Sequence, residues 1–483
     1  MPKWLALLFL TCLLGLAYGL SLAPGLTWAN NGVDGGDLIS ATASGGVAHP
    51  SGYPLYLALA GLFQRLPVGS LAFRTNLMSA LCSLLAAGLL FELLEKQLGS
   101  TPTALLAALA YGLSPLVWSQ AVITEVYALQ ALLTVAVLYA LLSPVRKPAW
   151  LVGQGLLFGL AAGNHLTSLF LAPLLIFLNP RAADEARGRP VLSRPSARVI
   201  GFRFAGLILG LLVYGLLPLR ASARPPVNWG NPVTLDNFWW LVSAQIYRGS
   251  AFSLSAPEML ERFQGWAGLL LGQFTLIGLG IGLYGVMAKL PAALRASTIW
   301  LFASFSLFAI FYAYADSYVY LLPASLALAV WIAAGLQDLS AALREMGYTW
   351  GPFLFVVLLA GLLVRSLYLF PELDASRDGR AEAFGHEIMS SAPPDALIFT
   401  DTDEETFSLW YFHFALKERQ DLSIVAEGLL PFDWYQKSLG WTYPSLTVPG
   451  PMPRPETIKR ANPMRPSCFV AYNDRPMIDC TEP

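Results

Sequence analysis

Charged residues are scarce in this 483-residue chain: they make up 13% of it, whereas a soluble domain typically carries about 25%. The 30 Lys and Arg residues nearly balance the 31 Asp and Glu residues, and no basic run is long enough to attract nucleic acid. Hydrophobic residues account for 55% of the chain. The composition therefore excludes a nucleic-acid-binding protein and predicts a chain whose main solvent is the lipid bilayer.

Cysteine is also rare. Cys12 and Cys82 lie in apolar stretches, and Cys468 and Cys480 lie in the polar C-terminal tail. No pair has the spacing of metal ligands, so we predict no metal site. A disulfide between Cys468 and Cys480 and a pair of free thiols both fit the sequence, and the choice depends on the redox compartment of the tail.

Long apolar runs are abundant. A helix that crosses a bilayer needs about 20 mostly apolar residues. About eleven such segments recur, at 4–22, 76–94, 104–117, 123–142, 151–162, 166–178, 204–219, 266–287, 300–313, 318–334 and 353–369. Several are short, which predicts tilted or re-entrant segments. The first segment also fits a signal peptide, because Lys3 precedes it and Ala17-Tyr18-Gly19 resembles a cleavage site; we favour a retained anchor.

Basic residues in the short loops predict the orientation of the chain in the membrane. If the N-terminus lies inside, the inner loops hold Lys96, Arg146, Lys147, Arg181, Arg187, Arg189, Arg194, Arg198, Lys289, Arg295 and Arg344. The loops at 21–74 and 220–262 and the tail from 371 onward then lie outside. We predict an integral membrane protein, of the cytoplasmic membrane if the source is bacterial, with its polar chemistry on the extracytoplasmic face.

The predicted fold is mainly α: a polytopic bundle of about eleven transmembrane helices over residues 1–370, followed by a small extracytoplasmic α/β domain over 371–483. In this tail, 396–399 and 422–425 have the pattern of strands, and 407–419 that of an amphipathic helix. The seven prolines between 443 and 466 predict an extended wrap rather than regular structure.

The first outside loop combines acids with helix-breaking residues. Asp34 and Asp37 lie three residues apart beside glycines, a pattern that also fits a simple helix cap. The segment from His49 to Tyr53 is rich in Pro and Gly, and irregular backbone at membrane depth survives only when it is buried or lines a wet cavity. His49 could bind a phosphate, orient a carboxylate or be satisfied within the elbow. A cavity beside this loop follows from each interpretation.

Further polar residues fall at the outside ends of other helices. Glu125, His165 and Asp316 are costly at the edge of a membrane segment and are therefore candidate site residues, with hydrogen bonding between helices as the alternative. The second outside loop contains Arg220 and Arg248 together with tryptophans. The arginines can bind a phosphate, and the rings can stack on a sugar. An aromatic belt at the membrane interface would use similar rings.

These residues together resemble the DUF2723 family, which includes a eukaryotic branch of multi-pass protein O-mannosyltransferases. The matching segments, in the order of the family, are Asp34-Gly35-Gly36-Asp37, residues 47–56, Arg74-Thr75-Asn76, Trp118, Glu125-Val126-Tyr127, Gly163-Asn164-His165, Leu217-Pro218-Leu219-Arg220 and residues 226–232. They cover most of the chain as far as Arg248.

The resemblance implies a GT-C type glycosyltransferase that takes a sugar from a polyprenyl-phosphate donor and inverts the anomeric centre. By motif match Asp34 is the general base, and Asp37 and Glu125 are further catalytic candidates. The family often has Glu at the position of Asp37, which leaves that residue a supporting role. The candidate substrate-binding residues are His49, Tyr53, Arg74, Asn76, His165, Arg220, Asn228, Trp229, Arg248 and Asp316. No cofactor is expected apart from the lipid-linked donor; a divalent metal is not indicated, and the acceptor is a protein, a glycan or a lipid.

Two other interpretations compete with this one. Asp401-Thr402-Asp403 resembles the D-x-D motif that binds a metal and a nucleotide-sugar, but it lies on the outer side, where nucleotide-sugars are generally absent. We therefore expect the tail to bind the acceptor or to be structural. A transporter or flippase of a lipid-linked or small solute would also use broken helices and intramembrane acids. Against it, the acids gather on one face, and no inverted repeat is evident.

Overall fold

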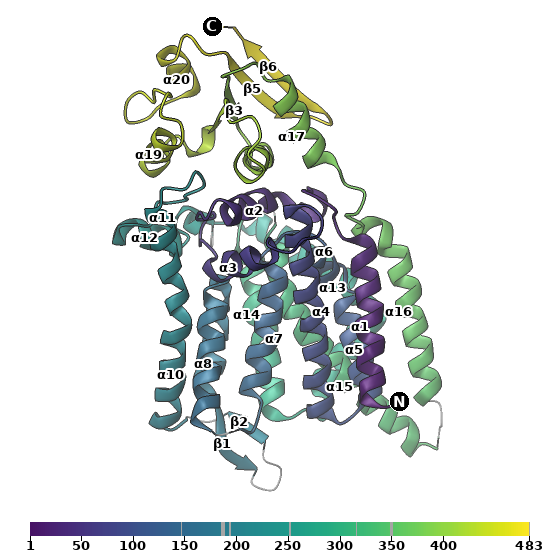
Figure 1. The fold of residues 1–483 in the computed structure, drawn as a ribbon. Helices are drawn as coiled ribbons and strands as arrows, with labels where there is room; N and C mark the ends of the chain where they lie inside the picture. Colours follow the sequence, from purple (N-terminus) through teal and green to yellow (C-terminus); the bar gives the residue numbers. More distant parts are fainter. Residues whose placement is uncertain are drawn as a thin grey trace.

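The structure, a computed structural model, describes residues 1–145, 147–184, 189–192, 195–250, 253–314, 316–347 and 351–482. Arg146, Arg187 and Arg194, which we assign to inner loops, lie outside the described residues. The long helices run side by side and roughly parallel (Figure 1). The N-terminus and the strands β1 (Leu178–Asp184) and β2 (Arg189–Leu192) lie at one end of this bundle, and the C-terminal region lies at the other.

The helical part consists of α1 (Lys3–Ser21), η1 (Ala29–Asp34), α2 (Gly35–Ala43), α3 (Pro54–Phe63), α4 (Leu71–Leu98), α5 (Thr101–Gly112), α6 (Pro115–Ala121), α7 (Tyr127–Leu141), α8 (Pro148–Ala162), η2 (Leu166–Leu171), α9 (Ala172–Phe177), α10 (Ala197–Leu211), η3 (Leu212–Gly215), α11 (Leu216–Ser222), α12 (Leu235–Val242), η4 (Gln245–Ser250), α13 (Ala256–Met287), α14 (Ala292–Phe311), η5 (Ser317–Leu321), α15 (Leu322–Glu345) and α16 (Gly351–Leu373). The short helices α2 and α3 lie across the end of the bundle that faces the C-terminal region (Figure 1).

Among the described residues, seven helical segments are long and apolar enough to cross a membrane: Lys3–Ser21, Leu71–Leu98, Ala197–Ser222, Ala256–Met287, Ala292–Phe311, Ser317–Glu345 and Pro352–Leu373. The pair α5 and α6, bent by 64°, makes an eighth if it is one span. The remaining predicted segments fall on α7, α8 and η2 with α9, which are shorter. Each apolar segment predicted from the sequence thus lies on a helix, and the short ones are partial or broken spans.

Helices α8 and α10 approach each other closely because glycines face glycines. A Cβ atom at Gly155 would overlap the carbonyl oxygen of Arg203, and one at Gly206 would overlap that of Val152. Gly159 and Gly210 meet the opposite backbones one turn further on. In a bilayer, helices associate through such close packing rather than through the hydrophobic effect.

The C-terminal region contains α17 (Arg380–Ser391), β3 (Leu397–Thr400), α18 (Asp403–Trp410), η6 (Tyr411–Ala415), β4 (Ser423–Ala426), η7 (Glu427–Leu429), α19 (Asp433–Thr442), α20 (Pro455–Ala461), β5 (Ser467–Tyr472) and β6 (Pro476–Thr481). Its strands form one sheet in the order β4-β3-β5-β6, in which β3 is parallel to both neighbours and β6 is antiparallel to β5. The two strands and the helix predicted at the start of the tail are confirmed.

Two further details of the tail can be compared with the sequence. Cys468 and Cys480 form a disulfide between paired positions of β5 and β6. The prediction of an extended wrap over 443–466 is wrong in part, because α20 lies within it. Pro455 occupies the start of that helix, where a missing N–H costs nothing.

Side-chain hydrogen bonds and one close backbone contact fix the C-terminal region on the helical bundle. The Nε1 of Trp28 donates to Ser408 Oγ at 3.1 Å, and Asp378 accepts from Thr27 Oγ1 at 2.7 Å and from the backbone N–H of Trp28 at 2.9 Å. Helix α18 presses its backbone at Phe407 against Gly36 of α2, where a Cβ atom would not fit. Helix α2 is therefore held between the bundle and the C-terminal region.

The glycine contact between α8 and α10 leads to a prediction. Gly155→Ala and Gly206→Ala should each force the two backbones apart and destabilise the protein by about 1–3 kcal/mol, measured as a lower apparent Tm in detergent. Gly153→Ala and Gly201→Ala are matched controls on the same helices, since a Cβ at either position meets no atom within 4 Å. Equal stability of the two sets would contradict the packing described here.

Candidate functional site

A cavity of about 510 Å³ lies where η1, the segment from His49 to Tyr53, η4, η5 and the start of α18 converge. Its lining mixes carboxylates, one arginine, histidines and many tyrosines. A concave site of this size with a few convergent polar groups is the usual form of a small-molecule site. It lies at the end of the bundle beneath the C-terminal region.

At one side of the cavity, His49 lies between two carboxylates. Its Nδ1 is 2.7 Å from Asp37 Oδ2, and its Nε2 is 3.4 Å from Asp34 Oδ2. The backbone N–H of His49 also donates to Asp37 Oδ2, at 2.9 Å. Asp37 is fully buried, whereas the side chain of Asp34 is 32% exposed and lines the cavity. Asp37 thus fixes the imidazole, and Asp34 is the carboxylate that a ligand can reach.

Local backbone geometry places the two acids on different sides of His49. Asn30 and Asn31 adopt left-handed conformations, with φ of 54° and 61°, which asparagine tolerates better than most residues. They turn the chain so that α2 begins at Gly35, with Asp34 at the N-cap position. The Asp34 side chain forms no capping hydrogen bond, so the simple helix-cap interpretation does not describe it.

The loop at 220–262 completes the support of Asp37. The backbone N–H of Val47 donates to the carbonyl of Val227 at 3.0 Å, and the N–H of Trp229 donates to the carbonyl of Val47 at 3.2 Å. This short pairing brings the Trp229 indole over Asp37, where Nε1 donates to Oδ1 at 3.0 Å. Both oxygens of the buried carboxylate therefore have partners, as burial of a charge demands.

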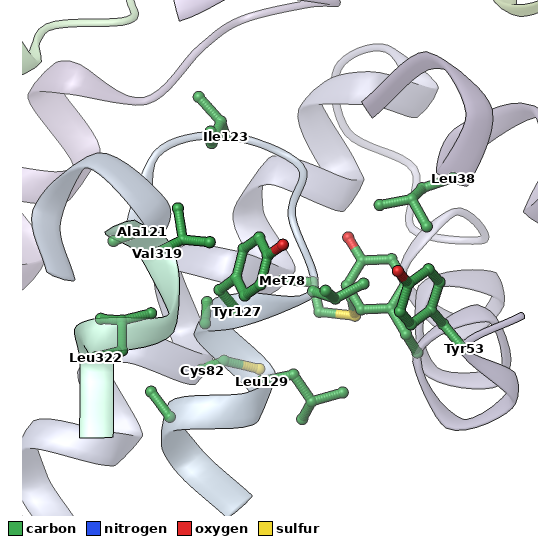
Figure 2. Packing of buried hydrophobic residues seen from close by; sticks show 14 of the residues in the cluster. Leu38, Tyr53, Met78, Cys82, Ala121, Ile123, Tyr127, Leu129, Val319 and Leu322 are labelled. Atoms are coloured by element: carbon green, nitrogen blue, oxygen red, sulfur yellow. The ribbon is translucent and has the colours of Figure 1, made fainter. Parts of the chain in front are cut away.

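Aromatic rings form another wall of the cavity. His165 lies 5.9 Å from Tyr53, 5.7 Å from Tyr127 and 5.5 Å from Tyr320, measured between ring centroids. Figure 2 shows Tyr53 and Tyr127 packed among other buried side chains, which include Leu38 and Met78. Rings on a rigid base of this kind provide the flat apolar faces on which sugars stack.

Burial and neighbouring charges shift the acid–base properties of the site. Burial raises the pKa of Asp34; His49 opposes this rise and Asp37 adds to it. Burial alone would lower the pKa of His49, but Asp34 and Asp37 together raise it to about 9. At neutral pH His49 is therefore a cation held between the two acids. A carboxylate with a raised pKa is a stronger base than an ordinary aspartate.

Seven of the predicted site residues line the cavity: Asp34, His49, Tyr53, Glu125, His165, Arg248 and Asp316. Asp37 and Trp229 lie directly behind them, through the contacts described above. Glu125 is 4% exposed. No hydrogen bond or ion pair joins the Arg248 guanidinium to any other side chain that the structure describes, which leaves it available for an anion.

Four predicted binding residues do not line the cavity. Their side chains donate to backbone carbonyls instead. Arg74 donates to the carbonyls of Gln64, Val68 and Gly69, and Asn76 donates to those of Ala23 and Gly25. Arg220 donates to the carbonyl of Gly46, and Asn228 to that of Ala221. These side chains hold the loops in place, and the geometry does not support direct contact with a substrate.

Sequence reasoning expected the tail to bind the acceptor or to be structural, but it did not place acids of the tail beside Asp34. Asp403 and Glu404, in the first turn of α18, line the same cavity as Asp34. Burial raises the pKa of Asp403 to about 6, and the charge of Asp34 adds to the rise. The D-x-D motif did mark Asp403, which the structure places in the same cavity as Asp34. Among the described residues, no three His, Cys, Asp or Glu side chains converge to hold a metal ion.

Two family models match this chain. One, described as the N-terminal domain of the protein O-mannosyl-transferase TMEM260, matches residues 34–184, and the other, described as TMEM260-associated domain 2, matches residues 381–469. The first match begins at Asp34, and the second includes Asp403. The matched regions thus contain Asp34, Glu125, Asp403 and Glu404 of the cavity lining, whereas Asp316 lies between them.

Two curated relatives match this chain over nearly its whole length. The mouse protein O-mannosyl-transferase TMEM260 is 27% identical over 480 residues, which cover 92% of this chain and 65% of the relative. The Dictyostelium discoideum protein of the same name is 20% identical over 536 residues, covering 98% and 63%. The chain thus spans a little less than two thirds of the length of these curated relatives.

Solved structures resemble the whole chain. ArnT from Cupriavidus metallidurans, crystallised with undecaprenyl phosphate, superposes with a TM-score of 0.61 at 16% identity, covering 98% of this chain and 97% of ArnT. Its apo structure gives a TM-score of 0.60 at 16% identity, covering 97% and 92%. The predicted fold class, a polytopic helical bundle of GT-C type with a small C-terminal sheet region, is confirmed.

The charge of His49 predicts how stability depends on pH. The His49 pKa is about 9 in the folded chain, against 6.5 for an unperturbed histidine. The folded protein therefore keeps a proton that the unfolded chain releases in this range. The resulting stabilisation, up to about 3 kcal/mol, is fully present below pH 6.5 and is lost as the pH rises through 9. We expect the apparent Tm in detergent to fall over this window.

The variant His49→Gln should lose most of this pH dependence, whatever its absolute stability. His386→Gln, at an exposed position on α17, is the control and should keep the profile of the wild type. If His49→Gln showed the same decrease in Tm between pH 6.5 and 9 as the wild type, the ion pairs of His49 would not stabilise the fold.

Proposed function

We propose that this protein is an inverting membrane glycosyltransferase, which transfers a sugar from a polyprenyl-phosphate donor to an extracytoplasmic hydroxyl, with Asp34 as general base. The observation that carries the proposal is the ligand-accessible Asp34 carboxylate, set beside a His49 cation that buried Asp37 fixes in place. The sequence resemblance to DUF2723 and the names of the two curated relatives support a mannosyl donor and a polypeptide acceptor.

The cavity offers a position for each reacting group. Arg248 is a free guanidinium on the lining and suits a phosphate, which it can bind through two parallel hydrogen bonds. The aromatic wall around His165 suits the face of the sugar. Asp34 then accepts the proton of the acceptor hydroxyl as its oxygen attacks the anomeric carbon, and the bond from that carbon to the phosphate oxygen breaks. Attack opposite to the leaving phosphate inverts the anomeric centre.

Two cations, Arg248 and protonated His49, face the groups whose charge changes during the reaction. The lipid phosphate gains negative charge as the sugar leaves, and Arg248 stabilises it, since a preformed donor needs no reorganisation. His49 remains protonated beside Asp34 and holds that carboxylate in one orientation. The ArnT crystal structure with undecaprenyl phosphate, a protein of the same fold, supports a lipid-phosphate ligand for this architecture.

A transfer assay with Asp34→Asn tests the proposal. We expect purified wild type to transfer labelled mannose from undecaprenyl-phosphate mannose, and Asp34→Asn to lower kcat by at least about 100-fold, since an amide cannot accept the proton. The rate of the wild type should rise with pH through a pKa above the ordinary 3.8 of an aspartate. Asp37→Asn, which leaves the base in place but loosens His49, should show a smaller loss.

Asp236→Asn, an exposed acid at the start of α12, is the matched control and should keep full activity. Equal rates for wild type and Asp34→Asn would show that Asp34 is not the base. Absence of transfer from every lipid-phosphate donor, together with movement of a solute across vesicles that contain the protein, would instead indicate a transporter.

A further inference from the structure

The lining of the cavity carries more negative charge than the proposed reaction uses. Its basic groups are Arg248 and the His49 cation, and its carboxylates are Asp34, Glu125, Asp316, Asp403 and Glu404. His49 is already engaged with Asp34 and Asp37. On the proposed function, on which this inference rests, Arg248 binds the phosphate of the donor, which is itself an anion. Of the remaining carboxylates, Asp403 and Glu404 then face the substrates without a hydrogen-bond or ion-pair partner in the part of the chain that the structure describes.

Asp403 and Glu404 line the cavity from the first turn of α18, and a capping box fixes this turn. The hydroxyl of Thr402 caps the start of α18, and Glu405 completes the capping box by accepting from the backbone N–H groups of Asp401 and Thr402 at 3.1 and 3.2 Å. Glu405 therefore holds the turn. No hydrogen bond or ion pair joins Asp403 or Glu404 to another residue in the described part of the chain, and both remain accessible to solvent.

Nearby cations outside the lining are already engaged. Arg380, which lies in the field of Glu404, donates to Asp378 at 2.6 Å. Arg262, in the field of Asp316, donates to Ser317 Oγ and to the carbonyl of Tyr314, both at 2.8 Å. Neither arginine forms an ion pair with Asp403 or Glu404 within the described structure, and a bound cation would stabilise these two acids.

A buried amide shows that the missing group is a donor. Gln120 lines the cavity and is 2% exposed, and its Oε1 has no hydrogen-bond partner among the described residues. A buried acceptor without a donor is unfavourable by about 1–3 kcal/mol, so such atoms usually meet a partner in the functional state. A ligand that carries N–H or O–H groups would satisfy both Gln120 and the acids.

The arrangement of the acids favours an organic cation over a metal ion. In the described ranges, no three candidate ligands lie close enough together to share one ion. Asp403 and Glu404 are consecutive residues on an exposed first turn, and carboxylates in this position pair well with ammonium or guanidinium groups. Mannose, the sugar in the name of the curated relatives, is neutral, and the phosphate of the proposed donor is an anion, which leaves the acceptor as the source of positive charge.

We infer that the acceptor is a polypeptide segment in which Lys or Arg flanks the target hydroxyl, and that Asp403 and Glu404 bind this basic side chain. The C-terminal region would then determine acceptor specificity, while α2 supplies the base. Because α18 is pressed on Gly36, one residue from Asp37, acceptor recognition and catalysis share a rigid support.

The test uses the full-length protein, undecaprenyl-phosphate mannose and three serine peptides that differ only in flanking Lys, Ala or Glu. We expect the wild type to favour the Lys peptide over the Ala peptide by about tenfold in kcat/KM at low salt, with the Glu peptide poorest and the preference weaker at high salt. In the double variant Asp403→Asn with Glu404→Gln, the ratio of Lys to Ala peptide should fall toward one.

Asp401→Asn is the matched control: it lies in the same D-x-D motif, is exposed and does not line the cavity, so it should keep the preference. A wild type with no preference, a double variant that keeps it, or a preference that requires added Mg²⁺ would each overturn the inference. Transfer to a glycan or lipid hydroxyl but to no peptide would also do so.

Binding of the same labelled peptides, followed by fluorescence anisotropy, separates this inference from the proposed function. If the wild type transfers no mannose but binds the Lys peptide through Asp403 and Glu404, the proposed function fails and acceptor recognition stands. If transfer depends on Asp34 but both peptides bind equally, the reverse holds.

Discussion

The buried pair of Asp37 and His49 is the interaction on which the rest of the site depends. A carboxylate with no exposed surface must have a partner at every oxygen, because an isolated charge in a medium of low polarity is strongly unfavourable. Asp37 obtains these partners from two places far apart in the chain: the backbone N–H and imidazole of His49, and the indole of Trp229. The irregular backbone of the loops at 21–74 and 220–262 is arranged around this one charge, and His49 links it to Asp34.

The same arrangement explains why the C-terminal region belongs to the site. Helix α2 is only nine residues long and lies across the end of the bundle rather than within it. Its outer face carries Gly36, and the backbone of α18 covers that face. Trp28 also ties the two parts together, because its backbone N–H donates to Asp378 and its indole donates to Ser408. A short helix that holds two acids near an apolar medium gains its rigidity from being enclosed on both faces.

Sequence reasoning reached the parts of this structure that depend on local pattern. The apolar segments fall on helices because length and hydrophobicity are properties of a single stretch of chain. Loop charges gathered Asp34, His49, Glu125, Arg248 and Asp316 on one side, and the cavity does contain them. The motif residues Arg74, Asn76, Arg220 and Asn228 fitted the same resemblance, but whether a side chain faces a ligand or a neighbouring carbonyl depends on tertiary packing. The D-x-D motif marked Asp403, but its place in the cavity was beyond reach for the same reason, since nothing in its own segment reveals that α18 docks on α2. The glycines of α8 and α10 are different, because their spacing of four residues is a readable signal for close helix packing.

Gathering several carboxylates around one cavity works against stability, and the structure shows where the compensation lies. Asp37 and His49 neutralise each other within the support, while Asp34, Asp403 and Glu404 keep contact with solvent through the cavity. The repulsion that remains falls on groups whose pKa values shift in response, as for Asp34 and Asp403. Strain of this kind is relieved when a ligand brings the missing charge, so the same electrostatics that disfavour the empty site favour the bound one.

Stability comes instead from elements distant from the cavity, such as the almost fully buried α15 and the glycine contact of α8 with α10. The fold thus separates the part that holds the chain together from the part that binds, and the acids can be tuned for substrates without loosening the bundle.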